Sequence, residues 1–277
     1  MMGAAPGAMG AAPGQKPSLS TAIGAVLLMD DVHAQVMATR ALVRRWRQGG
    51  IDFRCDTPLP DVPARPAAPP LLRPGAMPKR GKLGSVRGRI AMLHALAHIE
   101  YVAIALALDM AGRFGAHFPR AFVDDFLAVA ADEAMHFALL DRRLRALGSH
   151  YGALPAHDGL WQTATDTAHD PLARLAVVPM VLEARGLDVT PATITRFRAQ
   201  GDDASARILQ RIYNDEIRHV AIGTRWFEYG CDERQVESIA EWKRHVNAGF
   251  SGVIRPPFND SARQAAGLTQ LYYATIA

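Results

Sequence analysis

The sequence predicts an all-α protein built on a four-helix bundle, and three observations favour this fold class. Long segments repeat apolar residues at the three- and four-residue steps of an amphipathic helix. Proline and glycine are concentrated between these segments. Two of the segments also carry the same pattern, Asp-Glu-x-x-His, in corresponding positions. A chain of 277 residues is long enough for one large helical domain with an extension.

The N-terminal part is expected to form this extension. Residues 1–17 are rich in Gly, Ala, Pro and Met and lack the basic and apolar regions of a signal peptide, so we expect a disordered tail. A helix or helix pair is expected from Ser18 to Arg47, stopped by Gly49-Gly50. The proline-rich residues 56–80 cannot continue as a regular helix and predict an extended strap over the bundle. The extension therefore covers residues 18–85.

The metal-binding bundle and its C-terminal helices are expected over residues 86–277. Caps, prolines and glycines set the bounds of four bundle helices, which are 86–114, 119–147, 170–184 and 202–229. A loop is expected over 148–169, and a short helix is expected to begin at Thr190-Pro191. A fifth helix over 233–249 and a segment through Tyr273 are expected to pack outside the bundle.

The repeated pattern carries the chemistry. Its two copies are Asp132-Glu133-Ala134-Met135-His136 and Asp215-Glu216-Ile217-Arg218-His219, and Glu100 and Glu183 each lie 33 residues before a pattern glutamate. On their helices these glutamates and histidines occupy positions where the inward stripe calls for apolar residues. One such motif is common by chance, whereas two inward copies with matched glutamates are typical of a dinuclear metal site in a helical bundle.

Electrostatics favours metal binding by this set. Four buried carboxylates would be severely unfavourable without cations, and two divalent ions neutralise them. Oxygen-rich ligands with one nitrogen per ion suit iron or manganese. The predicted ligands are Glu100, Glu133, His136, Glu183, Glu216 and His219. Asp132 and Asp215 are expected to bond the histidine of the opposite motif, and the alternative is pairing with an arginine such as Arg142 or Arg218.

Several other residues near the predicted ligands can be explained by a structural role as well as by a functional one. His94 and His98 flank Glu100 but lie off its helix face, which favours structural histidines over ligands. Tyr101 and Tyr213 are either oxidisable residues or core aromatics, and the core explanation is favoured. Pro179 should kink the third helix, either to admit oxygen or substrate or only to shape the packing. The small residues Ala103 and Ala107 leave volume beside Glu100 or allow close helix packing.

Several stretches resemble the ferritin-like di-iron carboxylate superfamily and, more narrowly, a bacterial ferritin-like family catalogued as DUF455. They are residues 94–100, 178–188 and 215–219, with Pro257-Phe258-Asn259 and Ala266-Gly267 near the end. The resemblance spans nearly everything after the N-terminal tail. It implies the ferritin-like fold and the metal ligands, and it supplies no substrate. A tRNA hydroxylase of the superfamily makes nucleic acid a substrate by analogy only, which nothing else in the sequence supports.

The favoured function is an oxygen-dependent oxidase or hydroxylase that holds two iron ions and acts on a small molecule. Manganese is an alternative at one or both positions. No flavin or nicotinamide fingerprint is present, so electrons should come from a separate donor. The alternatives are a non-catalytic iron-handling protein and a structural protein stabilised by metal.

The expected location is the cytoplasm. Two isolated cysteines form no C-x-x-C pair and suggest a reducing compartment. No uninterrupted run of apolar residues suggests a membrane partner. A homodimer is compatible with the sequence.

Overall fold

The computed structural model describes residues 16–78 and 81–274, and the regular structure in these ranges is helical apart from two isolated bridges. Four long stretches form the central bundle: α3 (Val86–Phe114), α4 (Arg120–Ala146), the continuous run of α6 (Pro171–Val177), η3 (Val178–Glu183) and α7 (Ala184–Ala199), and α8 (Asp203–Arg234). Shorter elements surround them: α1 (Leu19–Leu27), α2 (Val32–Arg47), η1 (Pro74–Ala76), η2 (Gly115–His117), α5 (Gly159–Asp166), α9 (Ser238–Gly249), α10 (Asp260–Ala265) and α11 (Gln270–Tyr273). The predicted all-α class is therefore confirmed.

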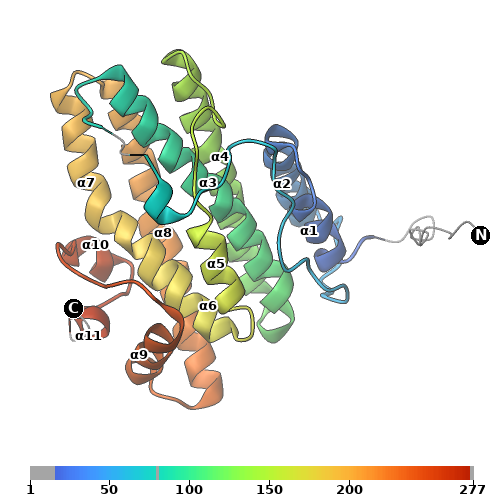
Figure 1. Cartoon of the computed structure of the whole chain (residues 1–277). Helices are drawn as coiled ribbons and strands as arrows, with labels where there is room; N and C mark the ends of the chain where they lie inside the picture. The colour runs from blue at the N-terminus through green and yellow to red at the C-terminus, as the bar shows by residue number, and fades with distance from the viewer. Residues whose placement is uncertain (1–15, 79–80, 275–277) are drawn as a thin grey trace, which may run out of the picture.

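The bundle consists of two helix pairs (Figure 1). α3 and α4 are joined by a short turn, as are α7 and α8, so the members of each pair are antiparallel neighbours. Contacts between α4 and α8 join the two pairs. The helices α1 and α2 pack on α3 and α4, whereas α9, α10 and α11 gather beside α6, α7 and α8 (Figure 1). This arrangement leaves the interior between the pairs for the predicted ligands.

Side-chain caps fix the starts of two bundle helices. The Ser85 hydroxyl accepts the Gly88 N–H at 3.0 Å at the start of α3, and a carboxylate oxygen of Asp202 accepts the Ser205 N–H at 3.0 Å at the start of α8. Each cap satisfies a donor that has no partner within its own helix. The helix starts predicted near residues 86 and 203 are confirmed.

The proline-rich segment forms the predicted strap in its described part. It lies over the connection between α4 and α6, where the Leu72 N–H donates to the Ala156 carbonyl at 2.8 Å and Arg65 pairs with Asp158 at 2.6 Å. The expected tail of residues 1–17 lies outside the described residues up to position 15. Pro17 already belongs to the fold, because its carbonyl accepts the Asp52 N–H at 3.0 Å.

Pro179 alters its helix, as the sequence predicts, because proline has no N–H to donate. The segment Val178–Glu183 is a π-helix between α6 and α7, a form that is rare and frequent at functional sites. Gly223 of α8 makes room for it, since a Cβ there would lie 2.3 Å from the Pro179 Cβ. The close approach of α8 to this segment therefore requires glycine at position 223.

The sequence prediction was wrong about the end of this helix near Ala184 and a new helix at Thr190-Pro191. α7 continues to Ala199 with Pro191 inside it. A proline leaves the carbonyl four residues earlier without its helical partner, and here that carbonyl belongs to Leu187. The side-chain amide of Asn259 donates to it at 3.1 Å. A residue far away in sequence thus supplies the hydrogen bond that Pro191 cannot.

The predicted loop over 148–169 was also wrong, because it contains α5. Threonine is a weak helix former, which explains why the local pattern did not indicate a helix. The hydroxyls of Thr163, Thr165 and Thr167 donate to carbonyls four residues earlier. Trp161 is 3% exposed, and its indole donates to the Asp61 carbonyl at 3.1 Å. Burial of this tryptophan under the strap stabilises the helix.

The boundary between α8 and α9 lies later than predicted. α8 continues past Tyr229, its expected end, and α9 begins at Ser238 and not near residue 233. The next residue, Gly230, is of a type that often ends helices. Here it lies inside α8, and the close packing of α6 explains the glycine, since a Cβ at Gly230 would lie 2.6 Å from Leu172 Cδ2.

Among the described residues, the stretch Val86–His117 is long and apolar enough to span a membrane by length and composition, and an 18-residue window within it has a mean hydropathy of 1.7. Charged and histidine side chains interrupt this stretch, so it is not the uninterrupted apolar run that the sequence analysis considered. Within the fold, 61% of that window is buried. Such a composition is also expected of a helix packed on several sides, and α3 occupies this position.

Two helical glycines predict opposite effects on stability. Gly186 of α7 has no atom within 4 Å of the place that a Cβ would take. Gly186→Ala should therefore raise the free energy of unfolding by about 0.5–1 kcal/mol through helix propensity. Gly223→Ala would push a Cβ against Pro179 and should lower it by about 1–3 kcal/mol. Urea unfolding of the metal-free protein measures both, and equal stability of the two variants would contradict this packing.

Candidate metal centre

The six predicted ligands converge on the bundle interior from four helical stretches. Glu100 comes from α3, Glu133 and His136 from α4, Glu183 from the end of η3, and Glu216 and His219 from α8. On α4, one row of buried residues steps by three and four: Phe122, Phe126, Val129, Glu133, His136, Leu140 and Leu144. The same apolar periodicity that folds the helix therefore turns its ligand residues inward.

Glu133 and Glu216 lie between the two histidines. Oε1 of Glu133 is 2.9 Å from Nδ1 of His219, and its Oε2 is 3.4 Å from Nδ1 of His136. Oε1 of Glu216 is 3.4 Å from Nδ1 of His219 and 3.9 Å from Nδ1 of His136. Each carboxylate thus approaches both imidazoles and could be shared between two ions bound beside them.

Glu100 and Glu183 complete the cluster. Oε2 of Glu100 is 3.2 Å from Nδ1 of His136. One donor atom from each of four residues lies within 4.8 Å of the others: Glu100, Glu133, His136 and Glu216. Glu183 lies outside this tightest group, lines the same cavity and interacts electrostatically with Glu216 and His219. The structure therefore brings all six residues to one site, with Glu183 the most loosely placed.

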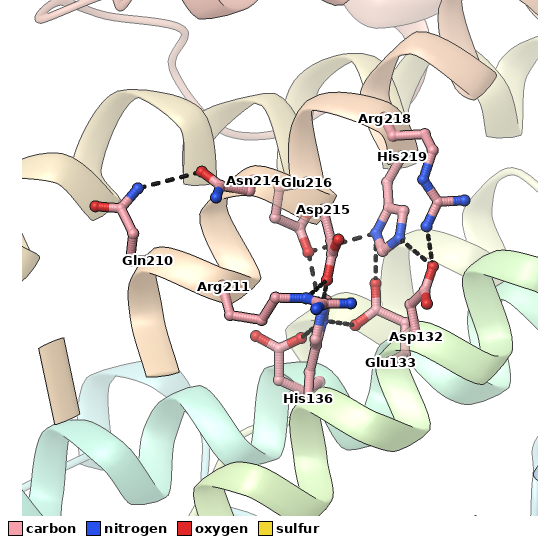
Figure 2. A network of polar contacts seen from close by, with 11 residues as sticks. Asp132, Glu133, His136, Gln210, Arg211, Asn214, Asp215, Glu216, Arg218 and His219 are labelled. Carbon is pink, nitrogen blue, oxygen red and sulfur yellow. Dashed lines mark hydrogen bonds and ion pairs between the residues drawn. The ribbon is translucent and has the colours of Figure 1, made fainter. Parts of the chain in front are cut away.

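Each aspartate of the repeated pattern reaches the histidine of the other helix, as predicted (Figure 2). Nε2 of His136 lies 3.1 Å from Asp215 Oδ2, and Nε2 of His219 lies 3.4 Å from Asp132 Oδ2. An ionised carboxylate accepts a hydrogen bond, so it fixes a proton on Nε2 and leaves Nδ1 as the nitrogen that would lose its proton to bind a cation. Both Nδ1 atoms face the glutamates.

Arginines support these aspartates from the outside (Figure 2). Arg211 donates to Asp215 at 2.7 Å, and Arg218 hydrogen-bonds Asp132. Burial alone would raise the pKa of each aspartate, but hydrogen bonds from the arginine and the histidine hold it below its ordinary value. The two alternatives from the sequence, a histidine or an arginine partner, are therefore both realised.

Protons compensate the charges of the cluster when no metal is bound. Burial and the Glu133 carboxylate raise the pKa of Glu100 well above its ordinary value, and burial and Glu216 raise that of Glu183 to about 8. Burial would lower the pKa of His136, but Glu100 and Glu133 raise it to about 11. Burial would raise the pKa of Glu133, but the adjacent imidazoles of His136 and His219 hold it well below its ordinary value. Bound divalent cations could supply the positive charge that these protons provide.

The residues fit a dinuclear metal group. Two buried atoms of the cluster, Glu133 Oε2 and His219 Nδ1, lack a hydrogen bond of good geometry within the described part of the chain. Buried polar atoms without partners are uncommon and costly. Four carboxylates and two imidazoles supply the oxygen-rich donor set that suits iron or manganese, and two divalent ions would balance the charge. The buried cluster can therefore hold metal.

His94 and His98 have the structural role favoured by the sequence. Nδ1 of His98 lies 2.8 Å from the Tyr151 hydroxyl, and its Nε2 lies 3.1 Å from the His157 carbonyl oxygen. Nε2 of His94 accepts the Gly152 N–H at 2.9 Å. Burial lowers the pKa of both histidines to about 4, so they are neutral at pH 7. Together they fasten the segment after α4 to α3.

Tyr101 and Tyr213 belong to the packing around the site. Tyr101 is 4% exposed and packs against Phe137, and burial raises its pKa to about 12. The Tyr213 hydroxyl accepts a hydrogen bond from the Asn259 side chain at 2.9 Å, which ties α8 to the C-terminal segment. These contacts account for both rings as core aromatics.

A cavity of about 410 Å³ reaches the cluster between α3, α7 and α8. The four ligand glutamates line it together with many apolar side chains, among them Met92, Leu96, Ala103, Leu106, Leu209 and Ile212. The sequence had indicated volume near Ala103. It missed the outer part of the cavity, which includes Gly186, Thr193 and Arg196. The sequence feature that could have indicated this outer part is Gly186, a glycine between helix-forming residues.

Comparison with known proteins places this site in a family. The family model described as "Protein of unknown function (DUF455)" matches residues 28–274, which include the whole cluster. A Haemophilus influenzae protein described as an uncharacterized protein is 40% identical over 225 residues, which cover 79% of this chain and 78% of that protein. No solved structure matches the chain. The chain thus belongs to the DUF455 family.

Proposed function

We propose that this protein is a ferritin-like di-iron carboxylate protein that uses oxygen to oxidise or hydroxylate a small molecule. Its two antiparallel helix pairs, joined by a long connection, support the ferritin-like assignment. Each pair contributes one glutamate and one Glu-x-x-His motif, as such di-iron sites require. Manganese is compatible with the same donors at one or both positions.

The observation that carries the proposal is the apolar cavity that ends at the four glutamates. A metal bound only for stability needs no open position, and iron storage needs no chamber for an organic molecule. The volume of about 410 Å³ lies within the range typical of small-molecule sites. Its apolar walls favour a chamber that excludes bulk water from a reacting substrate.

The residues of the chain divide into three tasks in this proposal. Iron, when bound, would supply the activation of oxygen. The six ligands would hold it, with Glu133 and Glu216 shared between the two positions. Asp132 and Asp215 would keep each imidazole oriented with Nδ1 inward. The cavity wall would hold the substrate beside them, and a separate protein would supply electrons.

Metal content tests the ligand assignment. Iron-loaded protein should contain close to two ions per chain, about 3.5–4 Å apart, as in other two-metal sites. Glu133→Ala and Glu216→Ala should each lose the stable pair, because each removes a shared carboxylate. Asp132→Asn should keep both ions but bind them roughly 10–100-fold more weakly. Metal analysis and X-ray absorption measure these outcomes.

Two results would contradict this assignment. A folded wild-type protein with metal content near zero would exclude the dinuclear site. Complete metal loss in Asp132→Asn, equal to that in Glu133→Ala, would make Asp132 a direct ligand.

The metal-free protein should lose stability as the pH rises from about 5 to about 9. The pKa of Glu183 is about 8 and that of His136 about 11 in the folded chain, both above their unfolded values. The folded state therefore retains protons that the unfolded state releases, and stability falls with rising pH. Bound Mn²⁺ should replace these protons and abolish the decline.

Urea unfolding across this pH range, with and without Mn²⁺, measures the effect. The control is Glu233→Gln, an exposed change near the end of α8 away from the cluster, which should leave the pH dependence unaltered. Greater stability of the metal-free wild type at the high end of the range would refute the charge compensation described above.

Reaction with oxygen separates the candidate functions. Reduced, iron-loaded protein should give a transient visible absorption on exposure to oxygen and return to the ferrous state when electrons are supplied. An iron-handling protein would instead accept iron well beyond two per chain and deposit mineral. A structural metal site would leave oxygen unreduced. Stopped-flow absorption and iron titration distinguish these three results.

A further inference from the structure

One face of the continuous stretch of η3 and α7 extends the cavity from the glutamate cluster to the surface. The residues Glu183, Gly186, Thr190, Thr193 and Arg196 recur at steps of three or four and all line the cavity. At a helical rise of 1.5 Å per residue, this stripe is roughly 20 Å long. Its inner end is a carboxylate of the cluster, and its outer end is the exposed Arg196.

Arg196 provides a positive charge that no carboxylate neutralises. Its Nε donates to the Ala192 carbonyl of its own helix at 3.3 Å. Within residues 16–78 and 81–274, no carboxylate oxygen lies within 4.0 Å of its guanidinium. Arg185, the other arginine along the cavity, instead bonds Asp188 at 3.3 Å and two carbonyls of the C-terminal segment at 3.0 and 3.1 Å. Arg196 is therefore available to an anion.

Gly186 keeps the middle of the cavity open. Glycine inside a helix costs about 0.5–1 kcal/mol relative to alanine. Close packing does not demand it here, because the nearest atoms lie more than 4 Å from a Cβ at this position. A left-handed backbone does not demand it either, since Gly186 is not among the glycines with positive φ. The effect that remains is free volume on the cavity wall.

We propose that this cavity binds an amphipathic organic acid, with its anionic group at Arg196 and its apolar body directed past Gly186 toward the cluster. The middle of the wall is apolar, with Met92, Leu209 and Ile212 among its residues. The acids that line the cavity are the four cluster glutamates, and two divalent ions would neutralise them. The assignment of this acid as the molecule to be oxidised rests on the proposed function.

Calorimetry with octanoate and octanol on iron-loaded protein, in the absence of oxygen, tests the proposal. Wild-type protein should bind octanoate more tightly than octanol. Arg196→Gln should weaken octanoate binding roughly three- to fivefold, as expected for an exposed ion pair, and leave octanol binding unchanged. Arg198→Gln is the matched control, because Arg198 is exposed on the same helix and does not line the cavity. It should change neither affinity.

A second variant tests whether the apolar part of the bound acid passes Gly186. Gly186→Leu would place a side chain in the open volume and should weaken both ligands at least about tenfold, while metal content shows that the bundle has formed. Equal wild-type affinities for octanoate and octanol, or equal effects of Arg196→Gln and Arg198→Gln, would overturn the proposal. An unchanged octanoate affinity in Gly186→Leu would overturn the proposed course.

The binding result is independent of the oxygen reaction. Inertness toward oxygen together with the expected affinities would refute the oxidase and leave the acid site standing. Reaction with oxygen without preference for octanoate would do the reverse.

Discussion

Four carboxylates and two imidazoles gathered inside one helical bundle, with Glu183 and Glu216 partly buried and the other four fully buried, are the constraint on which the rest of the structure depends. Without compensation such a cluster would cost far more than the stability of a domain. Shared protons or divalent cations must therefore accompany it, and both place charge between Glu133, Glu216 and the two histidines. Because the cluster draws on both helix pairs, it can form only when α3–α4 docks onto α7–α8.

The two sides of the cluster differ in the way they meet the solvent. On the side of α4 and α8, Asp132 and Asp215 lie behind the imidazoles, and exposed arginines cover the aspartates. On the side of α3 and α7, an apolar cavity leads outward instead. The first arrangement fixes imidazole orientation through charged hydrogen bonds. The second leaves space for a molecule next to the glutamates. Rigid support on one side and access on the other are the properties required of a reactive site.

Backbone irregularity is concentrated along the stretch that borders the cavity. Pro179 produces the π-helix that ends at Glu183, and Gly223 allows α8 to approach it. Further along, Pro191 leaves the Leu187 carbonyl to Asn259, which also bonds Tyr213. The C-terminal segment thereby supports a helix that its own hydrogen bonds would leave weakened. Such departures from regular structure persist where the surrounding fold stabilises them, and they are common near functional sites.

The sequence by itself determined the elements whose signals are local. Helical periodicity, caps and the duplicated Asp-Glu-x-x-His pattern were sufficient to indicate the all-α class, the main helices and the six clustered residues, as well as the crossing of each aspartate to the opposite histidine. They can be read from the sequence because the same helical periodicity, on two separate segments, places each copy of the pattern on an inward face.

Only the tertiary structure decided where contacts between distant residues outweigh local preference. The helix at 159–166 depends on Trp161 under the strap, and the continuity of α7 depends on Asn259. The outer cavity is open because Gly186 faces empty space, and its outer end is positive because Arg196 meets no acid among the described residues. A sequence shows that a glycine or an arginine is present, but the atoms that lie opposite it are set by packing.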